Sequence, residues 1–186
     1  IDTETPMVWR GPMVTQALQQ LLNDTRWKDV DYLIVDLPPG TGDIQLTLAQ
    51  KVPVTCAVIV TTPQDIALLD ARKGLKMFEK VGIPILGIIE NMSGMDCPHC
   101  HKEIEVFRRG GGEASAADMN VPFLGRVPLD PEMVLQCDRG EPYALFHSDL
   151  PTADAIHGAA NKIEEFCKKK GSLVNVSARP APFKKP

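Results

Sequence analysis

Long hydrophobic runs are missing from this chain of 186 residues. No stretch approaches the roughly 20 consecutive apolar residues that a membrane-spanning helix needs, so we expect no stable membrane insertion. The segment from Ile1 to Pro12 lacks the charged and then apolar pattern of a secretion signal. Hydrophobic residues make up 44% and charged residues 24% of the chain, which is typical of a globular protein. The length corresponds to one domain with a substantial core.

Cysteines are few, and their number excludes another class of protein. There are five, an odd number, and only Cys97 and Cys100 lie close together in the sequence. Small secreted domains held together by disulfides carry even sets of cysteines. We therefore expect a reducing, intracellular environment and a special role for the one close pair.

Acidic residues are absent after Glu165. Six of the 20 Lys and Arg residues follow Cys167 and none of the 24 Asp and Glu residues does, so the chain up to Cys167 carries a net charge of −10. This acidic body argues against nucleic acid as the main partner. The final segment is basic and rich in proline, which predicts a disordered tail over residues 171–186 after a single domain over residues 1–170.

Four short apolar runs alternate with helical patterns. The helical patterns begin at Pro12, at Asp65, which we expect to cap its helix, and at Thr152, with the last one ending at Cys167. Gly82 and Pro84 are expected to end the middle helix. The apolar runs predict strands over residues 32–36, 56–61, 85–89 and 123–127. The alternation predicts an α/β fold with a mainly parallel sheet flanked by helices.

In a parallel sheet, ligands bind beyond the carboxyl ends of the strands. The segments at these ends are residues 36–43, 61–65, 90–94 and 128–130. Asp36 ends the first run, and a carboxylate there can hold Mg²⁺ through water in a nucleotide-hydrolysing site. The Pro-Pro-Gly-Thr-Gly-Asp sequence that follows favours a nucleotide switch, because glycines let backbone N–H groups approach a phosphate. The alternative is an acidic residue in an ordinary turn.

A second glycine-rich stretch, Arg108-Arg-Gly-Gly-Gly-Glu113, differs from a phosphate loop. It lacks the Gly-Lys-Ser/Thr ending that supplies the phosphate-binding lysine and the metal-binding hydroxyl. We interpret it as the flexible start of a short helix that runs through Met119.

The motif Cys97-Pro-His-Cys100 has several explanations. With His101 it matches a c-type haem site, which requires export. A redox dithiol normally precedes a helix, whereas residues 102–107 alternate like a strand. Two thiolates are half of a tetrahedral site, and a second copy could supply the other half for a [4Fe–4S] cluster or Zn²⁺. His99 and His101 could instead complete a zinc site within one chain, or the pair could carry no ligand.

Taken in chain order, the motifs resemble those of the Mrp/ApbC-type iron–sulfur cluster carriers, P-loop ATPases of the MinD/ParA superfamily, and of the similar NUBPL-like proteins. The resemblance covers about Met7 to Lys169 and corresponds to the carboxyl-terminal two-thirds of such a protein. It rests on the segments at residues 8–12, 27–36, 37–43, 61–65, 90–93, 97–100 and 127–130. It implies a P-loop NTPase-like fold of the MinD/ParA type, truncated at the N-terminus.

The resemblance also implies a nucleotide site. In this family, Asp36 matches the carboxylate linked to Mg²⁺, and Gly40 and Asp43 belong to the switch near the γ-phosphate of ATP. Asn91 matches the asparagine that contacts the adenine ring, and Pro128 packs near that ring. The lysine-containing phosphate loop of the family would lie upstream of Ile1. ATP hydrolysis is therefore expected of the longer protein, and these 186 residues alone are expected to bind ATP poorly.

For the cysteine pair, the resemblance implies that Cys97 and Cys100 hold a [4Fe–4S] cluster between the two subunits of a homodimer. Such a protein passes the cluster to apo-proteins in a process coupled to ATP binding and hydrolysis. It works in the cytoplasm, or in the mitochondrial matrix for a eukaryotic NUBPL-like member. Two other classes remain open from the residues alone: a MinD/ParA-type positioning ATPase without a cluster, and a zinc-stabilised interaction module.

Overall fold

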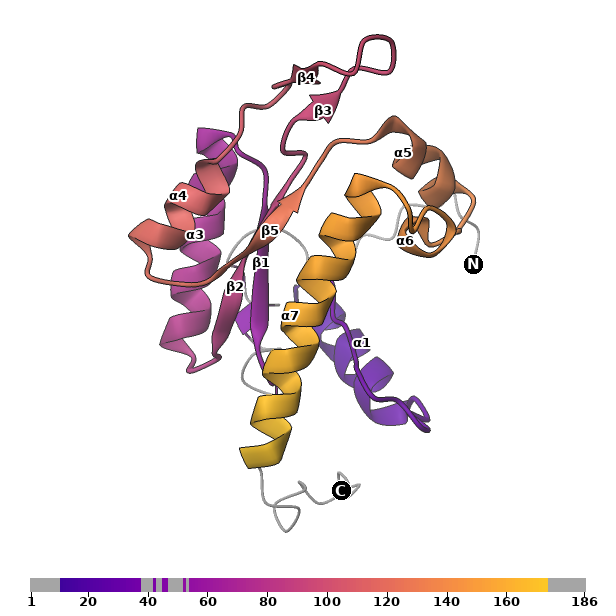
Figure 1. Cartoon of the computed structure of the whole chain (residues 1–186). Coiled ribbons are helices and arrows are strands. Elements are labelled where there is room, and N and C mark those ends of the chain that lie inside the picture. The colour runs from indigo at the N-terminus through magenta and orange to yellow at the C-terminus, as the bar shows by residue number, and fades with distance from the viewer. Residues whose placement is uncertain (1–10, 38–41, 43–44, 47–51, 53, 174–186) are drawn as a thin grey trace. The chain divides into compact units, whose positions relative to one another are not determined.

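The computed structural model describes residues 11–37, 42, 45–46, 52 and 54–173. The chain forms two compact units, one of residues 1–53 and 176–186 and the other of residues 54–175. In the first unit, the described helix is α1 (Gly11–Asp24), which begins beside Pro12 as the sequence predicts. The sheet and the remaining labelled helices belong to the second unit (Figure 1).

The centre of the second unit is a parallel sheet of strands β1 (Ala57–Thr61), β2 (Ile85–Asn91) and β5 (Phe123–Val127). Their order is β1-β2-β5, with β2 in the middle. Three of the four predicted strands and their parallel arrangement are therefore confirmed. Gly87 allows the close approach of β2 and β5, because an added Cβ would lie 2.4 Å from the Pro122 carbonyl oxygen.

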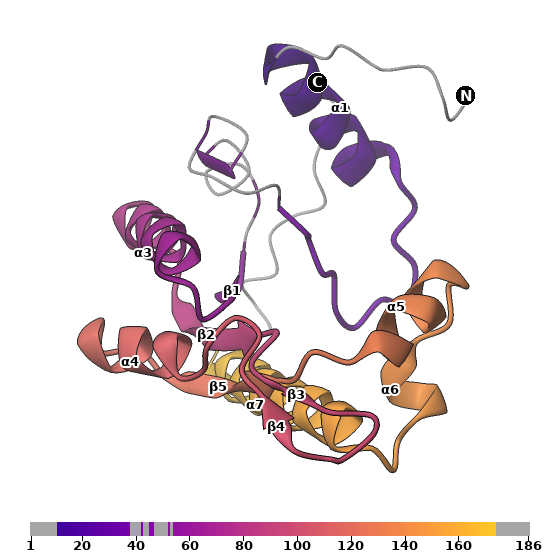
Figure 2. The same cartoon turned by 90° about the horizontal axis from the view of Figure 1, so that it is seen from above.

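Helices cover both faces of this sheet (Figures 1 and 2). Helices α3 (Asp65–Lys80) and α4 (Gly111–Asp118) pack on one face, and α7 (Pro151–Leu173) packs on the other. The core beneath α3 and α4 is formed by the buried side chains of Ile59, Leu75, Ile88 and Ala116. Burial of these apolar side chains is the main source of stability for this layer. The expected α/β class is confirmed.

The sequence predicted the carboxyl-terminal end of α3 correctly but not its amino-terminal cap. Gly82 has φ +75°, and the N–H groups of Gly82 and Ile83 bond back to the carbonyls of Glu79 and Phe78. This is the glycine-terminated helix end that the sequence predicts. The expected cap at Asp65 is wrong, because Gln64 holds the capping position and Asp65 is the first helical residue. Its carboxylate accepts a hydrogen bond from Arg108 Nη1 at 3.2 Å instead.

Two other boundaries differ from the sequence-based expectation. Residues 32–36 do not form a strand, and Ile34 is 80% exposed. A strand needs a neighbour to pair its backbone groups, and the described residues of that unit include no other strand. The last helix continues beyond Cys167 to Leu173, because residues 168–173 contain no helix breaker except Gly171. None of the described helices is long and apolar enough to cross a membrane.

Between β2 and α4 the chain forms an antiparallel hairpin of β3 (Met95–Asp96) and β4 (Glu103–Ile104), which we call the cysteine hairpin. Beyond β5, Asp130 caps α5 (Pro131–Asp138) by accepting a bond from the Glu132 N–H at 2.9 Å. The short helix α6 (Tyr143–Phe146) follows. The Tyr143 hydroxyl donates to the other oxygen of Asp130, so this one carboxylate fixes the start of α5 against α6.

Candidate functional site

The carboxyl ends of the three strands meet at one edge of the sheet. Thr61 is paired with Glu90, and Asn91 with Val127. The segments that follow β2 and β5 are joined by two backbone bonds, from Ser93 N to Val127 O at 3.1 Å and from Leu129 N to Gly94 O at 2.8 Å. The structure thus brings together three of the four segments in which the sequence places ligand-binding residues.

A cavity of about 280 Å³ opens at this edge. Its lining includes Pro128, the side chains of Arg109 and Arg126, and Glu103 from the cysteine hairpin. Asn91 is half-buried and is not among the residues that line the cavity. Its side-chain oxygen accepts a bond from the Met92 N–H at 2.9 Å. The predicted contacts of Asn91 and Pro128 with an adenine ring stay predictions.

The remaining predicted nucleotide residues lie in the other unit. Asp36 is exposed and, because the predicted strand does not form, it does not follow a strand. Gly40 and Asp43 lie outside the described residues. Their roles at Mg²⁺ and in the switch therefore stay predictions as well.

The cysteine hairpin presents its two thiols at a turn. Cys97 is half-buried and Cys100 is exposed. The turn is closed by bonds from Cys97 N to Lys102 O at 3.0 Å and from His101 N to Cys97 O at 2.9 Å. Of the strand-like stretch predicted at residues 102–107, only residues 103–104 form a strand. The cysteine turn is therefore followed by a strand and not by the helix whose N-terminus activates the thiol of a redox dithiol.

Hydrogen bonds nevertheless favour the thiolate form of Cys97. Backbone N–H groups of His99 and Cys100, and the Cys100 thiol, donate hydrogen bonds to it and hold the pKa of Cys97 below its usual value. Thiolates are the form in which cysteine binds metals. Among the described residues, no group of three or more His, Cys, Asp and Glu side chains could hold a metal ion. The hairpin therefore offers two cysteine ligands from one chain, and His99 and His101 do not complete a site with them.

Thiol reactivity provides a direct check of this environment. Burial, together with the neighbouring Cys167 thiol, raises the pKa of Cys56 to about 11, whereas the pKa of Cys97 is lowered. Near neutral pH we expect iodoacetamide to modify Cys97 at least about 100-fold faster than Cys56, because only the thiolate reacts. Peptide mass spectrometry of timed samples measures both rates. Similar rates at the two positions would contradict the difference in environment described for the two thiols.

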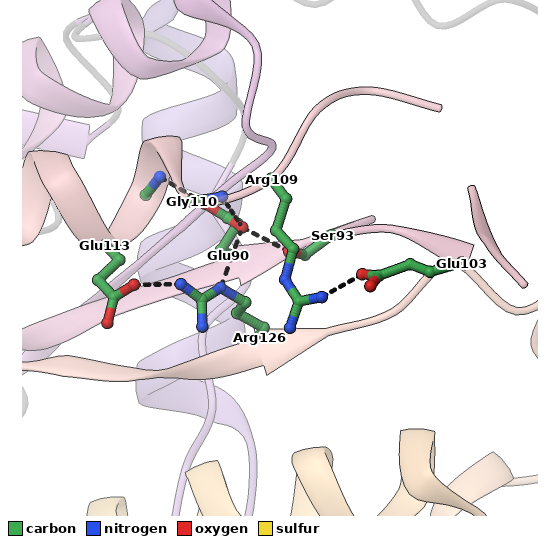
Figure 3. Close-up of polar contacts among 8 residues, drawn as sticks. Glu90, Ser93, Glu103, Arg109, Gly110, Glu113 and Arg126 are labelled. Carbon is green, nitrogen blue, oxygen red and sulfur yellow. Dashed lines mark hydrogen bonds and ion pairs between the residues drawn. The ribbon is translucent and has the colours of Figure 1, made fainter. Parts of the chain in front are cut away.

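Sequence reasoning missed the most heavily bonded side chain at this edge, Glu90, which is completely buried at the end of β2 (Figure 3). One carboxylate oxygen accepts bonds from Ser93 Oγ at 2.5 Å and from Gly110 N at 2.9 Å, and the other accepts from Gly112 N at 2.5 Å. Arg126 Nε forms an ion pair with Glu90 at 3.6 Å, and the same guanidinium pairs with Glu113. The only signal in the sequence was an acidic residue directly continuing a fully apolar strand.

Burial by itself raises the pKa of Glu90, because it penalises the charged form. The bonds from Ser93, Gly110 and Gly112, together with the charge of Arg126, outweigh this penalty and leave the pKa below its ordinary value. Glu90 is therefore a buried carboxylate that stays ionised, and its charge holds three segments of the chain together.

Two glycines of the stretch at residues 108–113 lie too close to neighbouring atoms for a larger residue to fit without a shift. An added Cβ at Gly112 would lie 3.0 Å from both Cβ and Oε2 of Glu90, and one at Gly111 would lie 2.6 Å from the Pro63 carbonyl oxygen. The short helix that we expected here is confirmed as α4, but its start is fixed by hydrogen bonds to Glu90. The expected flexibility of this start stays a prediction.

Alanine substitutions test this packing. Gly112→Ala is expected to lower the free energy of unfolding by about 1–3 kcal/mol, because the new methyl group displaces Glu90. Gly158→Ala on α7 is the matched control, since nothing lies within 4 Å of its added Cβ, and it is expected to raise stability by up to about 1 kcal/mol. Urea denaturation compares the two. Equal changes in unfolding free energy for the two variants would show that a methyl group at Gly112 does not displace Glu90.

Comparison with known proteins identifies the family of this chain. A family model described as "ParA: NUBPL iron-transfer P-loop NTPase" matches residues 1–164. An iron-sulfur cluster carrier protein of Pseudomonas fragi is 57% identical over 152 residues, which cover 82% of this chain and 53% of the relative. The chain spans about half the length of the curated relatives that it matches.

Solved structures show the same fold. A nucleotide-binding protein from Archaeoglobus fulgidus in complex with ADP is 34% identical, with a TM-score of 0.61 over 68% of this chain and 52% of that chain. The cell division protein MinD of Aquifex aeolicus matches with a TM-score of 0.58 over 86% of this chain and 63% of that chain, and at 22% identity it supports the fold alone. Since the family model covers most of the sequence, the chain belongs to the NUBPL-type iron-transfer P-loop NTPases of the ParA family.

Proposed function

We propose that this protein is an iron–sulfur cluster carrier in which two copies hold one [4Fe–4S] cluster between them through Cys97 and Cys100. The observation that carries the proposal is the cysteine hairpin, which presents two thiols at an exposed turn and lowers the pKa of one of them. Supporting it, the relative from Pseudomonas fragi is named an iron-sulfur cluster carrier protein.

The ligand count favours two copies. A [4Fe–4S] cluster is normally held by four thiolates, and one hairpin supplies two. A two-fold axis beside the turn would bring the same two residues from each copy to one cluster. A cluster held in this way is exposed and easily released, which suits cargo that is passed to apo-proteins. The positioning-ATPase alternative gives no role to the hydrogen bonds at Cys97.

We further propose that the carrier binds and hydrolyses ATP with Mg²⁺. Asp36 would hold Mg²⁺ through water, Gly40 and Asp43 would act in the switch, and Asn91 and Pro128 would contact the base. The P-loop NTPase family and the ADP-bound relative support nucleotide binding. We also propose that residues 1–170 belong to one nucleotide-binding domain with a basic tail. A reducing compartment, the cytoplasm or the mitochondrial matrix, suits thiols of this kind.

Anaerobic reconstitution tests the proposal. The protein, produced as its gene encodes it, is incubated with iron and sulfide, and bound iron, bound sulfide and visible absorbance are measured. Native mass spectrometry then gives the number of chains per cluster. Four iron atoms on two chains are expected. A monomer that retains iron would contradict the shared site, and a colourless protein that retains only zinc would identify a zinc-stabilised module instead.

A further inference from the structure

The loop before α4 connects two parts of the site that the proposed function treats separately. One end of the connection is Glu90, next to the predicted base-contacting residue Asn91. The other end is Glu103, in the cysteine hairpin. Arg109 lies between them in the loop, as Figure 3 shows.

The first contact in this connection joins the loop to the end of β2. Glu90 is completely buried and accepts backbone bonds from Gly110 at 2.9 Å and Gly112 at 2.5 Å. A Cβ added at Gly112 would lie 3.0 Å from Glu90, so a side chain there would have to displace the carboxylate. The loop is therefore bonded directly to the end of β2.

The second contact reaches the hairpin. Arg109 Nη1 donates to Glu103 Oε1, and the two side chains are 43% and 46% exposed. Glu103 also lies against Gly94, where an added Cβ would be 2.9 Å from the same oxygen. Glu103 is thus held between the loop and the segment that joins β2 to β3. The adjacent residue, Lys102, accepts the bond from Cys97 N that closes the cysteine turn.

The cavity at the sheet edge gives a ligand access to this connection. Pro128, Arg109 and Glu103 all line it. Leu129, which follows Pro128, bonds to Gly94 at 2.8 Å. A nucleotide base beside Pro128, the predicted base-contacting residue that lines the cavity, would therefore lie next to Arg109 and Glu103, which hold the hairpin in place.

We propose that the Arg109–Glu103 ion pair is the contact through which nucleotide occupancy sets the position of the cysteine hairpin. The inference rests on the proposed function and assigns Arg109 and Glu103 as positioning residues. The coupling free energy between nucleotide binding and hairpin position cannot exceed the free energy of the ion pair that connects them. For an exposed ion pair this limits the effect of nucleotide on thiol accessibility to a factor of up to about five.

Alkylation of the cluster-free protein measures this link without needing a cluster. Rates at Cys97 and Cys100 are determined by mass spectrometry with and without saturating Mg-ADP, using the protein as its gene encodes it. The variants are Arg109→Glu, Glu103→Arg and the double exchange, which restores an ion pair of reversed orientation. Arg108→Glu is the matched control, because Arg108 lies in the same loop but pairs with Asp65 of α3 at 3.2 Å.

In the wild type we expect ADP to change both rates by about two- to fivefold. Each single variant should remove the change, the double exchange should restore it, and Arg108→Glu should keep it. The inference is overturned if ADP has no effect in the wild type, if the single variants respond like the wild type, or if the double exchange fails to recover the response.

Reconstitution of the same preparations separates this inference from the proposed function. A protein that shows the ADP effect but binds no cluster refutes the carrier function and leaves the link intact. A protein that binds the cluster but shows no ADP effect refutes the link alone.

Discussion

Replacing either Cys97 or Cys100 by serine is expected to eliminate iron retention after anaerobic reconstitution. A serine hydroxyl remains protonated and hard, whereas iron in these clusters is held by thiolates. In a site shared by two chains, each substitution removes two of the four ligands at once. The loss should exceed the roughly 10- to 100-fold reduction in affinity caused by losing an outer-shell partner. Bound iron and sulfide per chain, measured after gel filtration, give the result.

Cys137→Ser is the matched control for this experiment. Cys137 is an exposed free thiol on α5, away from the cysteine hairpin, so its loss should leave the iron content unchanged. Retention of a full cluster by Cys97→Ser would refute the proposed ligand set. Equal loss in all three variants would point to non-specific iron binding by accessible thiols.

Glu90→Gln is expected to have the largest effect on stability, lowering the free energy of unfolding by about 3 kcal/mol. Both carboxylate oxygens of Glu90 accept bonds, and an amide nitrogen in place of either one faces an N–H or O–H donor. The charge that faces Arg126 is lost in the same step. Urea denaturation measures the change, and Ser93→Ala, which removes one donor only, should cost about 1 kcal/mol.

The effect of pH distinguishes the lost charge from altered packing. Because the pKa of Glu90 is lower in the folded state, its ionisation stabilises the protein fully above the ordinary glutamate value of about 4.3. This contribution is lost as the pH falls through the lowered value in the folded protein. The stability difference between wild type and Glu90→Gln should therefore shrink in acid. A difference that stays constant from neutral to acidic pH would show that charge plays no part.

Local sequence signals predicted a large part of the second unit. The runs at residues 56–61, 85–89 and 123–127 contain β-branched and other apolar residues that suit a strand covered on both faces, and each forms a strand. Gly82 ended α3 as expected because its positive φ is a property of the residue itself. The alternation after Cys100 likewise indicated the second strand of the hairpin.

Features that depend on distant partners were not predictable in this way. The apolar run at residues 32–36 has the composition of a strand, but pairing requires a neighbour that composition does not specify. Glu90 gave only a weak signal, because its partners Gly110 and Gly112 lie 20 and 22 residues further along the chain. The glycines of that loop indicated an unusual backbone, and only the structure shows that a buried carboxylate requires them.

The hydrogen bonds to the Cys97 sulfur also make the cysteine pair more sensitive to oxidation when no cluster is bound. Thiolates are the form of cysteine that oxidants attack, and the Cys100 thiol is in direct hydrogen-bond contact with this one. In air, the unloaded hairpin is therefore the part of the described chain most ready to close into a disulfide, which cannot accept iron until a reductant opens it. For the proposed carrier, loading of a cluster would therefore require a reductant as well as iron and sulfide.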